Sequence, residues 1–346
     1  MIRTVDARVD VLRNGAVLTQ LRASEEEAPH IRMRSSASIK SSLTGSFRPN
    51  AQVDWLRDEL RPVLILDGVE HPMGRFAPAT VTFGSVDGKR QVQVEAYDRC
   101  WRVESTRSEK LVHLGAGTNY IDAIKTLLAR SGISLVLATP CASVLSTDRE
   151  DWNLGESTLT IVNQLLDEIN YKSLWFDAAG FAVLEPKSRV TAENIVRSYD
   201  AGNSKLLMHD RVSAQMDLYN APNVFLCVCS NPGGAAPMCA RAENNNPASP
   251  LSIIRRGRRI AQTYKIRNIA DQAALQEYAD LLCQDSMLLG TTAEISTAPM
   301  PGCGADDVVA LVHPDMEGLC REVEWEVDLC AGGTMTHKLE KAVMQL

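Results

Sequence analysis

Aromatic residues are scarce in this sequence of 346 residues, where Phe, Trp and Tyr together make up 5%. Few rings are therefore present to stack against sugars, which disfavours a carbohydrate-binding module. No apolar run approaches the length of a membrane span, and the segment Met1–Asp6 lacks the apolar region of a signal peptide. Nine cysteines occur in no secretory spacing. These absences predict free thiols in a reducing cytoplasm and no membrane span.

Excess positive charge is also missing, because 36 Lys and Arg residues oppose 43 Asp and Glu residues, a net charge of −7. A dedicated nucleic-acid binder normally carries the opposite balance. A net-negative wall instead suits a channel past which nucleic acid moves without binding tightly. The concentrated basic segment is Arg255–Arg259. It would suit phosphate, but guanidinium groups also suit carboxylates, and in a net-negative chain we favour a protein contact or a solvated role.

Recognised catalytic motifs are absent from the sequence. Neither HExxH nor Gly-x-Ser-x-Gly occurs, and no Ser or Cys lies in a known nucleophile motif. The carboxylate pairs Asp306-Asp307 and Glu322/Glu324 would suit a glycosidase, although strand ends and exposed faces usually carry such charges. A triad assembled in space stays open. We predict no catalytic residue, and the scattered histidines are His30, His71, His113, His209, His313 and His337.

Metal and cofactor sites are not predicted either. Cys227 and Cys229 alternate along one strand with Cys239 ten residues further on, which is not a zinc spacing and fits core packing. The segment Gly115–Gly117 precedes a helix but lacks the third glycine of a dinucleotide fingerprint. Helix capping explains these glycines better.

Short strands separated by tight turns dominate the first hundred residues. Val5–Arg13 and Ala16–Leu21 flank Asn14-Gly15, a favoured two-residue turn. Arg75–Phe83 and Gln91–Tyr97 flank a similar turn at Asp87-Gly88. This pattern predicts a closed barrel or a sandwich of antiparallel strands. Further strands are expected at Ile31–Ser36, Ala37–Ser46 and Pro62–Leu66.

Helical periodicity appears in the middle of the chain. Thr118 is expected to cap a helix that ends near Ser131-Gly132, and Ser157 to cap one that ends at Asn170. The segments Tyr171–Asp177 and Gly180–Pro186 then read as a hairpin. This part is predicted to be a small α/β domain.

Strand patterns return after about residue 198, with candidates at Val212–Leu218 and Val224–Ser230. The segment Asn231–Ser252 is rich in Pro, Gly, Ala and Asn and has no periodicity, which is typical of an exposed functional or disordered loop. Its role stays open between a surface connection and an arm that orders on a partner. A helix capped by Asn268 and stopped by Gly290 follows. The closing strands are expected at Thr291–Ser296, Asp307–Leu311, Glu322–Ala331, Thr334–Leu339 and Ala342–Leu346.

The predicted fold class is therefore α+β and mainly β. We place the first β-barrel at 1–104, the small α/β domain at 105–197, and the second β-barrel at 198–346. The second barrel carries the loop and a helical insertion at about 231–290.

Several segments, in this order along one chain, carry a resemblance to a known family. They are Ser38–Phe47, Val53–Pro62, Val69–Phe76 with its His71–Arg75 core, Val94–Asp98, the Gly117–Leu128 helix, the unit of Trp152, Tyr171, Asp177 and Gly180, Asn246–Ser252, and Gly332–His337. Over essentially its full length the chain resembles the baseplate hub proteins of contractile phage tails and phage-tail-like particles. The resemblance implies two tail-tube-like barrels on one polypeptide. It further implies a homotrimer, whose six barrels form a pseudo-hexameric ring between the six-fold tail tube and a three-fold spike.

The resemblance also implies the partners. These are a central spike protein, the tail tube or a tube-initiator protein, and other baseplate proteins, with DNA or a tape-measure protein passing through the lumen unbound. Such a protein would lie in the tail baseplate of a virion or phage-tail-like particle, after assembly in the bacterial cytoplasm. Two other functions remain as alternatives. One is a tail-associated cell-wall hydrolase, for which a second β block ending at Leu346 leaves no appended lytic module; the other is a receptor- or glycan-binding module at a tail tip.

Overall fold

The structure is a computed structural model that describes residues 4–24, 28–202, 209–214, 221–230, 237–286, 288–314 and 316–342. Its fold is α+β and mainly β, with 44% of the described residues in strands and 16% in helices, which confirms the predicted fold class. Within the described ranges, no helix is both long enough and apolar enough to cross a bilayer.

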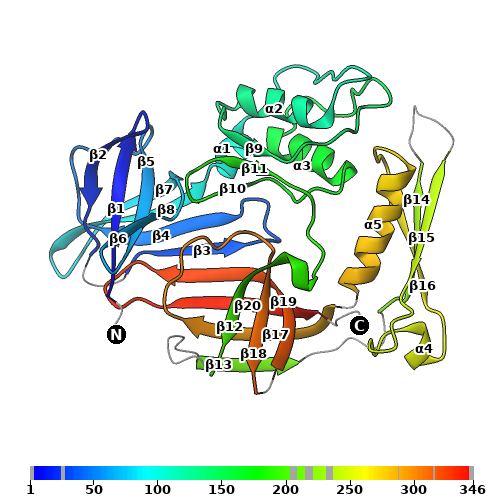
Figure 1. The fold of residues 1–346 in the computed structure, drawn as a ribbon. Helices are drawn as coiled ribbons and strands as arrows, with labels where there is room; N and C mark the ends of the chain where they lie inside the picture. Colours follow the sequence, from blue (N-terminus) through cyan, green and yellow to red (C-terminus); the bar gives the residue numbers. More distant parts are fainter. Residues whose placement is uncertain are drawn as a thin grey trace.

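The first part of the chain is a set of antiparallel strands. They are β1 (Val5–Arg13), β2 (Ala16–Leu21), β3 (His30–Arg34), β4 (Ser41–Phe47), β5 (Glu59–Leu66), β6 (Val69–Pro72), β7 (Phe76–Val86) and β8 (Lys89–Asp98). Their order across the sheet is β2-β1-β5-β7-β8-β4-β3, with β6 on β5 (Figure 1). The predicted turns form as expected: Asn14 and Gly15 have φ of 52° and 81°, and Asp87 and Gly88 have 48° and 74°. Such paired positive φ values match the twist of a hairpin.

The last part of the chain continues the same sheet. Its strands are β12 (Ile195–Asp200), β13 (His209–Ala214), β17 (Leu288–Thr297), β18 (Asp307–His313), β19 (Met316–Asp328) and β20 (Met335–Ala342). The path runs from β3 to β19, β20, β17 and β13, while β18 joins β19 to β12. At the junction Met33 lies opposite Trp325, and one apolar cluster includes residues from both parts. The expected strand Glu322–Ala331 begins earlier, at Met316, because residues 316–322 pair with β18. The expected strands Val212–Leu218 and Ala342–Leu346 lie partly outside the described residues, at 215–218 and 343–346.

The middle of the chain forms the predicted small α/β part above the sheet (Figure 1). It comprises α1 (Cys100–Ser105), α2 (Tyr120–Arg130), β9 (Val136–Ala138), α3 (Thr158–Glu168), β10 (Trp175–Phe176) and β11 (Ala182–Leu184), followed by the short 3₁₀ helix η1 (Ala192–Asn194). Ser157 caps α3 as predicted, by accepting a hydrogen bond from the Thr160 backbone N–H. The cap of α2 is Asn119 rather than Thr118, because its side chain accepts from the N–H groups of Ile121 and Asp122.

A separate three-stranded insert corrects the interpretation of Asn231–Ser252. It contains β14 (Val224–Cys229), β15 (Met238–Glu243), the one-turn helix α4 (Ile253–Arg256), β16 (Ala261–Ile266) and α5 (Gln272–Asp285). Residues 231–236 lie outside the described residues, but the segment that follows is an ordered strand paired with β14 and a packed turn. Small alternating residues hide the strand pattern, since Ala240 and Ala242 supply its buried positions. The prediction of an aperiodic loop was therefore wrong for the strand at Met238–Glu243, whereas residues 244–252 form an ordered loop.

Helix α5 begins later and ends earlier than expected. Asp271, not Asn268, is its N-cap, because the Asp271 carboxylate accepts from the Ala274 backbone N–H. The helix ends at Asp285, and Gly290 lies within β17 instead. Leu288 lies opposite Ala342, so the residues predicted as the last turn of the helix pair with β20 as part of β17 instead. Tertiary pairing thus overrides local helix propensity here.

Candidate assembly interface

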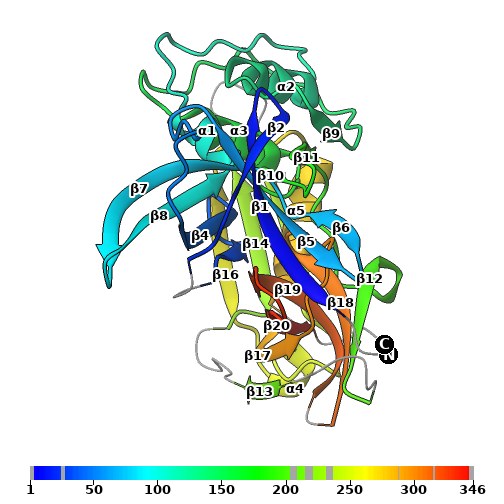
Figure 2. The same cartoon turned by 90° about the vertical axis from the view of Figure 1, so that its left-hand side faces the viewer.

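The hairpin of β7 and β8 projects from the body of the sheet (Figure 2). Strand β4 pairs with β8 only as far as Val92, opposite Phe47, so the outer part of the hairpin extends beyond its neighbour. On the other side, β5 pairs with β7 at Leu60 and Phe76 alone. In the described part of the chain, the outer edge of β7 beyond Phe76 therefore has no partner strand.

The ladder of this hairpin shows which backbone groups are available. A two-residue turn closes on a hydrogen-bonded pair, here Val86 and Lys89, and hydrogen-bonded pairs alternate with pairs that face outward. Ser85 and Phe83 belong to the pairs that face outward. Their N–H and C=O groups therefore point to the open edge, where another strand can continue the sheet.

Both faces of the outer hairpin are also exposed. Every residue from 82 to 90 is exposed, and Phe83 shows 70% of its surface. A two-stranded ribbon has little stability of its own in water. Phe83 on such a ribbon is therefore a candidate contact for another protein.

A second exposed apolar residue, Leu56, lies at the end of the sheet where β1 turns into β2. Its exposed fraction is 95%. The turn that carries it is rigid, because buried Asp58 accepts two hydrogen bonds of 2.8 Å from Arg13 and one of 2.8 Å from the Asp54 backbone N–H. The carboxylate of Asp54 in turn accepts from the Leu56 N–H at 3.1 Å.

Arg13 also lowers the pKa of Asp58, chiefly through these hydrogen bonds. Asp58 therefore remains a carboxylate under ordinary conditions, and the backbone that carries Leu56 is held in place without help from a partner. A preorganised backbone of this kind loses little conformational entropy on binding. Leu56 is a second candidate contact for assembly.

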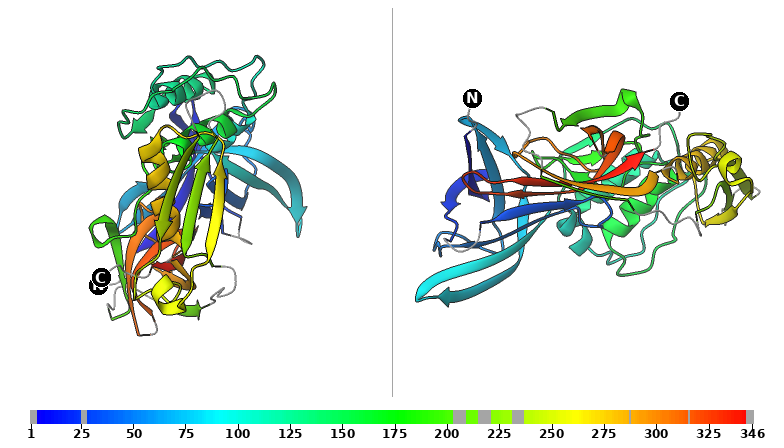
Figure 3. Two further views of the ribbon diagram at one scale, coloured as in Figure 1. Left: turned by 90° about the vertical axis from the view of Figure 1, so that its right-hand side faces the viewer. Right: turned by 90° about the horizontal axis from the view of Figure 1, so that it is seen from below.

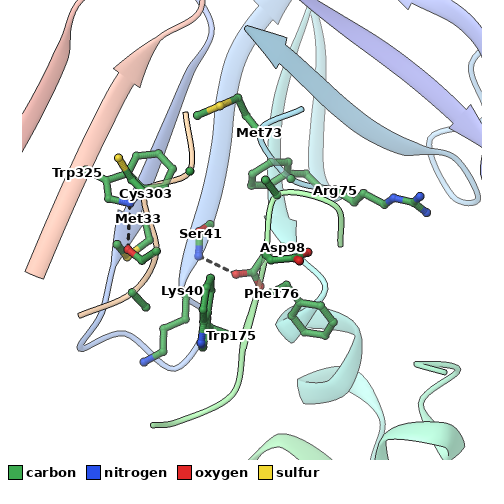
Figure 4. A pocket seen from close by; sticks show the side chains of 17 residues that line it. Met33, Lys40, Ser41, Met73, Arg75, Asp98, Trp175, Phe176, Cys303 and Trp325 are labelled. Atoms are coloured by element: carbon green, nitrogen blue, oxygen red, sulfur yellow. Dashed lines mark hydrogen bonds between the residues drawn. The ribbon is translucent and has the colours of Figure 1, made fainter. Parts of the chain in front are cut away.

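The sheet, the small α/β part and the loop after Met300 meet at a cavity of about 40 Å³ (Figure 4). Asp98 lies at its wall, where its carboxylate accepts from the N–H groups of Ser41 and Cys100. Burial raises the pKa of Asp98 to about 6 and lowers the pKa of the neighbouring Lys40. A cavity this small admits water but no substrate, since ligand pockets usually enclose several hundred Å³. We interpret this cavity as a packing gap at the junction of the three parts.

Sequence reasoning missed a triad-like arrangement in the second part of the sheet. His337 Nε2 lies 2.8 Å from Thr297 Oγ1, and His337 Nδ1 hydrogen-bonds Glu322. Tyr199 donates to the same Glu322 carboxylate at 3.1 Å, and Arg197 contacts both Glu322 and Asp307. The period-two pattern was a usable signal, because His337 lies between the buried residues Met335 and Leu339.

This arrangement has the order of a catalytic triad but no access for a substrate. Thr297, His337 and Glu322 expose 2%, 0% and 0% of their surfaces. Catalysis needs a space beside the nucleophile where a reacting atom can lie. The geometry instead satisfies buried polar groups between β12, β17, β18, β19 and β20.

The other residues singled out from the sequence lie apart. Cys227 and Cys229 face α5 in the core, as predicted, whereas Cys239 is exposed on β15. Gly117 has φ of 80° in the turn before α2, and His113 pairs with Glu150 at the surface. Among the described residues, no group of three His, Cys, Asp or Glu side chains is arranged to hold a metal ion.

Comparisons with known proteins give a match in structure alone. No family model matches the sequence, and no curated protein matches it. A tail protein from Neisseria meningitidis MC58 aligns with a TM-score of 0.67 at 13% identity, over 97% of this chain and 97% of that one. The chain has the fold of phage tail proteins.

Two further structures agree with this. The 43 kDa tail protein of prophage MuSo2 from Shewanella oneidensis aligns with a TM-score of 0.66 at 9% identity, over 97% and 98% of the two chains. A type VI secretion component of E. coli, described as similar to the T4 tail proteins gp27 and gp5, aligns at 0.52 with 10% identity, over 97% of this chain and 77% of that one. The tail-protein fold inferred from the sequence is thus confirmed over nearly the whole chain.

Proposed function

We propose that this protein is a structural hub of a contractile tail baseplate or injection particle, and not an enzyme. Three copies form a pseudo-hexameric ring that joins a six-fold tail tube to a three-fold spike. The observation that carries the proposal is the open edge of β7 on a chain with a tail-protein fold. A ring of subunits that continue one another's sheets closes on itself, so that no open edge is left for uncontrolled pairing.

The division into barrels at 1–104 and 198–346, around an α/β domain at 105–197, is part of this proposal. So are the partners: the spike, the tube or tube initiator, other baseplate proteins, and a payload that passes unbound through the lumen. The particle would be assembled in the bacterial host and the protein found in its baseplate. The likeness to tail proteins supports each of these, as does the excess of acidic residues for an unretained payload.

The mass of the purified protein, alone and with its spike, tests the proposal directly. Three copies in either sample are expected. A single copy in both samples would exclude the ring. Clearing of purified peptidoglycan by the same preparation would favour the hydrolase instead.

Two variants of one residue test the role of the β7 edge. Ser85→Pro removes an outward N–H without removing a hydrogen bond of the hairpin ladder, so assembly should weaken. Ser85→Ala keeps that N–H and serves as the matched control, with assembly unchanged. Equal assembly of both variants would exclude edge pairing at this position.

A further inference from the structure

The insert carries a rigid platform that the hub function does not by itself explain. Asn223 is fully buried at the base of β14, and its side chain donates to the carbonyls of Leu251 and Arg258 at 3.3 and 3.0 Å. It also accepts from the Ile260 N–H at 2.7 Å. Asn244, equally buried, donates to Ser249 at 3.0 Å, and its carbonyl accepts from Ile253. The backbone around α4 is thus fixed from inside.

On the outside this platform presents an apolar residue between positive charges. Ile254 is 60% exposed, and Arg255 and Arg258 are exposed beside it. Arg256 instead donates a hydrogen bond to the Ala221 carbonyl, and Arg259 forms an ion pair with Glu243. Among the described residues, neither Arg255 nor Arg258 has a side-chain partner. We call Ile254, Arg255 and Arg258 the basic corner.

The chemistry of the basic corner suits a protein surface more than nucleic acid. A phosphate backbone gains nothing from an exposed Ile, whereas apolar residues together with Arg are typical of the centres of protein interfaces. Lys and Arg are in excess by two within residues 223–286, while the rest of the chain carries a net charge of −9. Another copy of this chain therefore offers the opposite charge.

The position of the basic corner fits a head-to-tail contact. The insert lies at one end of the molecule, and β1, β5 and β6 lie at the other, in two perpendicular views (Figure 3). In a cyclic ring of three copies, each contact joins two different surfaces of the subunit. The complement of the basic corner should thus lie on the far end of the chain.

The far end of the molecule carries a row of side chains that complements the basic corner. Asp6 on β1, Ile65 on β5 and Glu70 on β6 lie directly opposite one another in register, so their side chains share one face. Ile65 is half-buried and both carboxylates are on exposed residues. Arg8 binds Glu70 at 2.5 and 2.7 Å. Asp10 binds both Arg8 and Arg61, and Asp67 is also near. Even so, the carboxylates of Asp6, Asp10, Asp67 and Glu70 outnumber the guanidinium groups of Arg8 and Arg61.

We propose that the basic corner of one copy docks on the row of Asp6, Ile65 and Glu70 of the next copy. This contact rests on the proposed ring and adds its specific surfaces. Ile254 would pack against Ile65, while Arg255 and Arg258 face the two carboxylates.

Charge reversal tests this docking in the full-length protein. Arg255→Glu/Arg258→Glu and Asp6→Arg/Glu70→Arg are each expected to raise the protein concentration needed for half assembly by about tenfold or more. The four changes combined should restore most of the loss, because the charges are then exchanged. Lys125→Glu/Arg130→Glu, on the exposed side of α2, is the matched control and should leave assembly unchanged. Mass in solution across a concentration series is the readout, with circular dichroism to confirm folding.

The outcomes separate the two proposals. A wild-type protein that stays a single copy at its highest soluble concentration, with and without the spike, overturns the ring and this contact together. Three copies that survive the reversal of Arg255 and Arg258 overturn the contact alone. Loss of retention on a short DNA duplex by that variant, with assembly intact, would assign the basic corner to phosphate. Weakened assembly without rescue by the fourfold exchange would reject Asp6 and Glu70 as the receiving surface.

Discussion

The two ends of the large sheet stabilise their interiors in different ways. In the first part the packed interior is apolar, with Leu43, Phe47 and Leu64 fully buried, and buried carboxylates such as Asp10 lie on the opposite face beside arginines. In the second part Glu322 and His337 are fully buried at the centre of the strands. Apolar packing stabilises the interior of the first part. The interior of the second part also contains charged side chains, whose partners come from several strands.

The charged network has a consequence for strand register. Arg197, Asp307, Glu322 and His337 come from β12, β18, β19 and β20, and they meet only if those strands are correctly aligned. A register shift between β19 and β20 occurs directly after Glu322. A one-residue slip would move a buried charge to the other face. We infer that this network fixes the alignment of the second part, as buried polar groups do in some other folds.

The largest effect is expected for Glu322→Ala. The change leaves Arg197 and His337 without their shared buried carboxylate. Breaking a buried ion pair from one side costs about 3–5 kcal/mol of unfolding free energy. Denaturant titration with tryptophan fluorescence measures it.

Two further variants serve as comparisons for Glu322→Ala. Glu317→Ala removes an exposed carboxylate from the same strand and should change stability by less than about 0.5 kcal/mol. Leu43→Ala creates a cavity in the first part, at a cost of about 2–5 kcal/mol. If Glu322→Ala proved as mild as Glu317→Ala, the network would contribute nothing and the contrast between the two parts would be lost.

The sequence predicted several elements that local chemistry decides, although the caps of α2 and α5 lie at Asn119 and Asp271 rather than at Thr118 and Asn268. Asn14-Gly15, Asp87-Gly88 and the Ser157 cap each act within a few residues, and each formed as expected. Elements decided by distant pairing were predicted less well. The end of α5 depends on β20, and β15 is visible as a strand only once β14 lies beside it.

The candidate interface was predicted in part. The strands Arg75–Phe83 and Gln91–Tyr97 and the turn between them were predicted, whereas the absence of a partner beyond Phe76 depends on where β5 ends. Leu56 could not be found by periodicity, because its exposure arises from the turn that Asp58 organises. The meeting of Glu322 and His337 was likewise hidden, since only the pairing of β19 with β20 brings them together.

An intermediate effect is expected from pH, at the junction of the first part with the α/β part. Burial raises the pKa of Asp98 to about 6, above its ordinary value of 3.8. The folded state therefore binds this proton more tightly than the unfolded state. Stability from this group should rise as the pH falls from about 6 to about 4, by up to about 3 kcal/mol.

Asp98→Asn removes that proton equilibrium and should flatten the stability profile between pH 4 and 6. Thermal unfolding at half-unit pH steps gives the comparison. Burial also lowers the pKa of the neighbouring Lys40. An unchanged slope in Asp98→Asn would assign the pH dependence to other carboxylates.

The smallest effect is expected where the two parts of the sheet meet. Arg32 on β3 contacts Glu324 and Glu326 on β19, but its side chain is 40% exposed. Ion pairs at this exposure contribute about 0–1 kcal/mol, so Arg32→Ala should change the unfolding free energy by less than about 1 kcal/mol. Met33, its neighbour in sequence, is buried opposite Trp325, and Met33→Ala should cost about 2–5 kcal/mol. A larger loss for Arg32→Ala than for Met33→Ala would mean that charge, and not burial, holds the two parts of the sheet together.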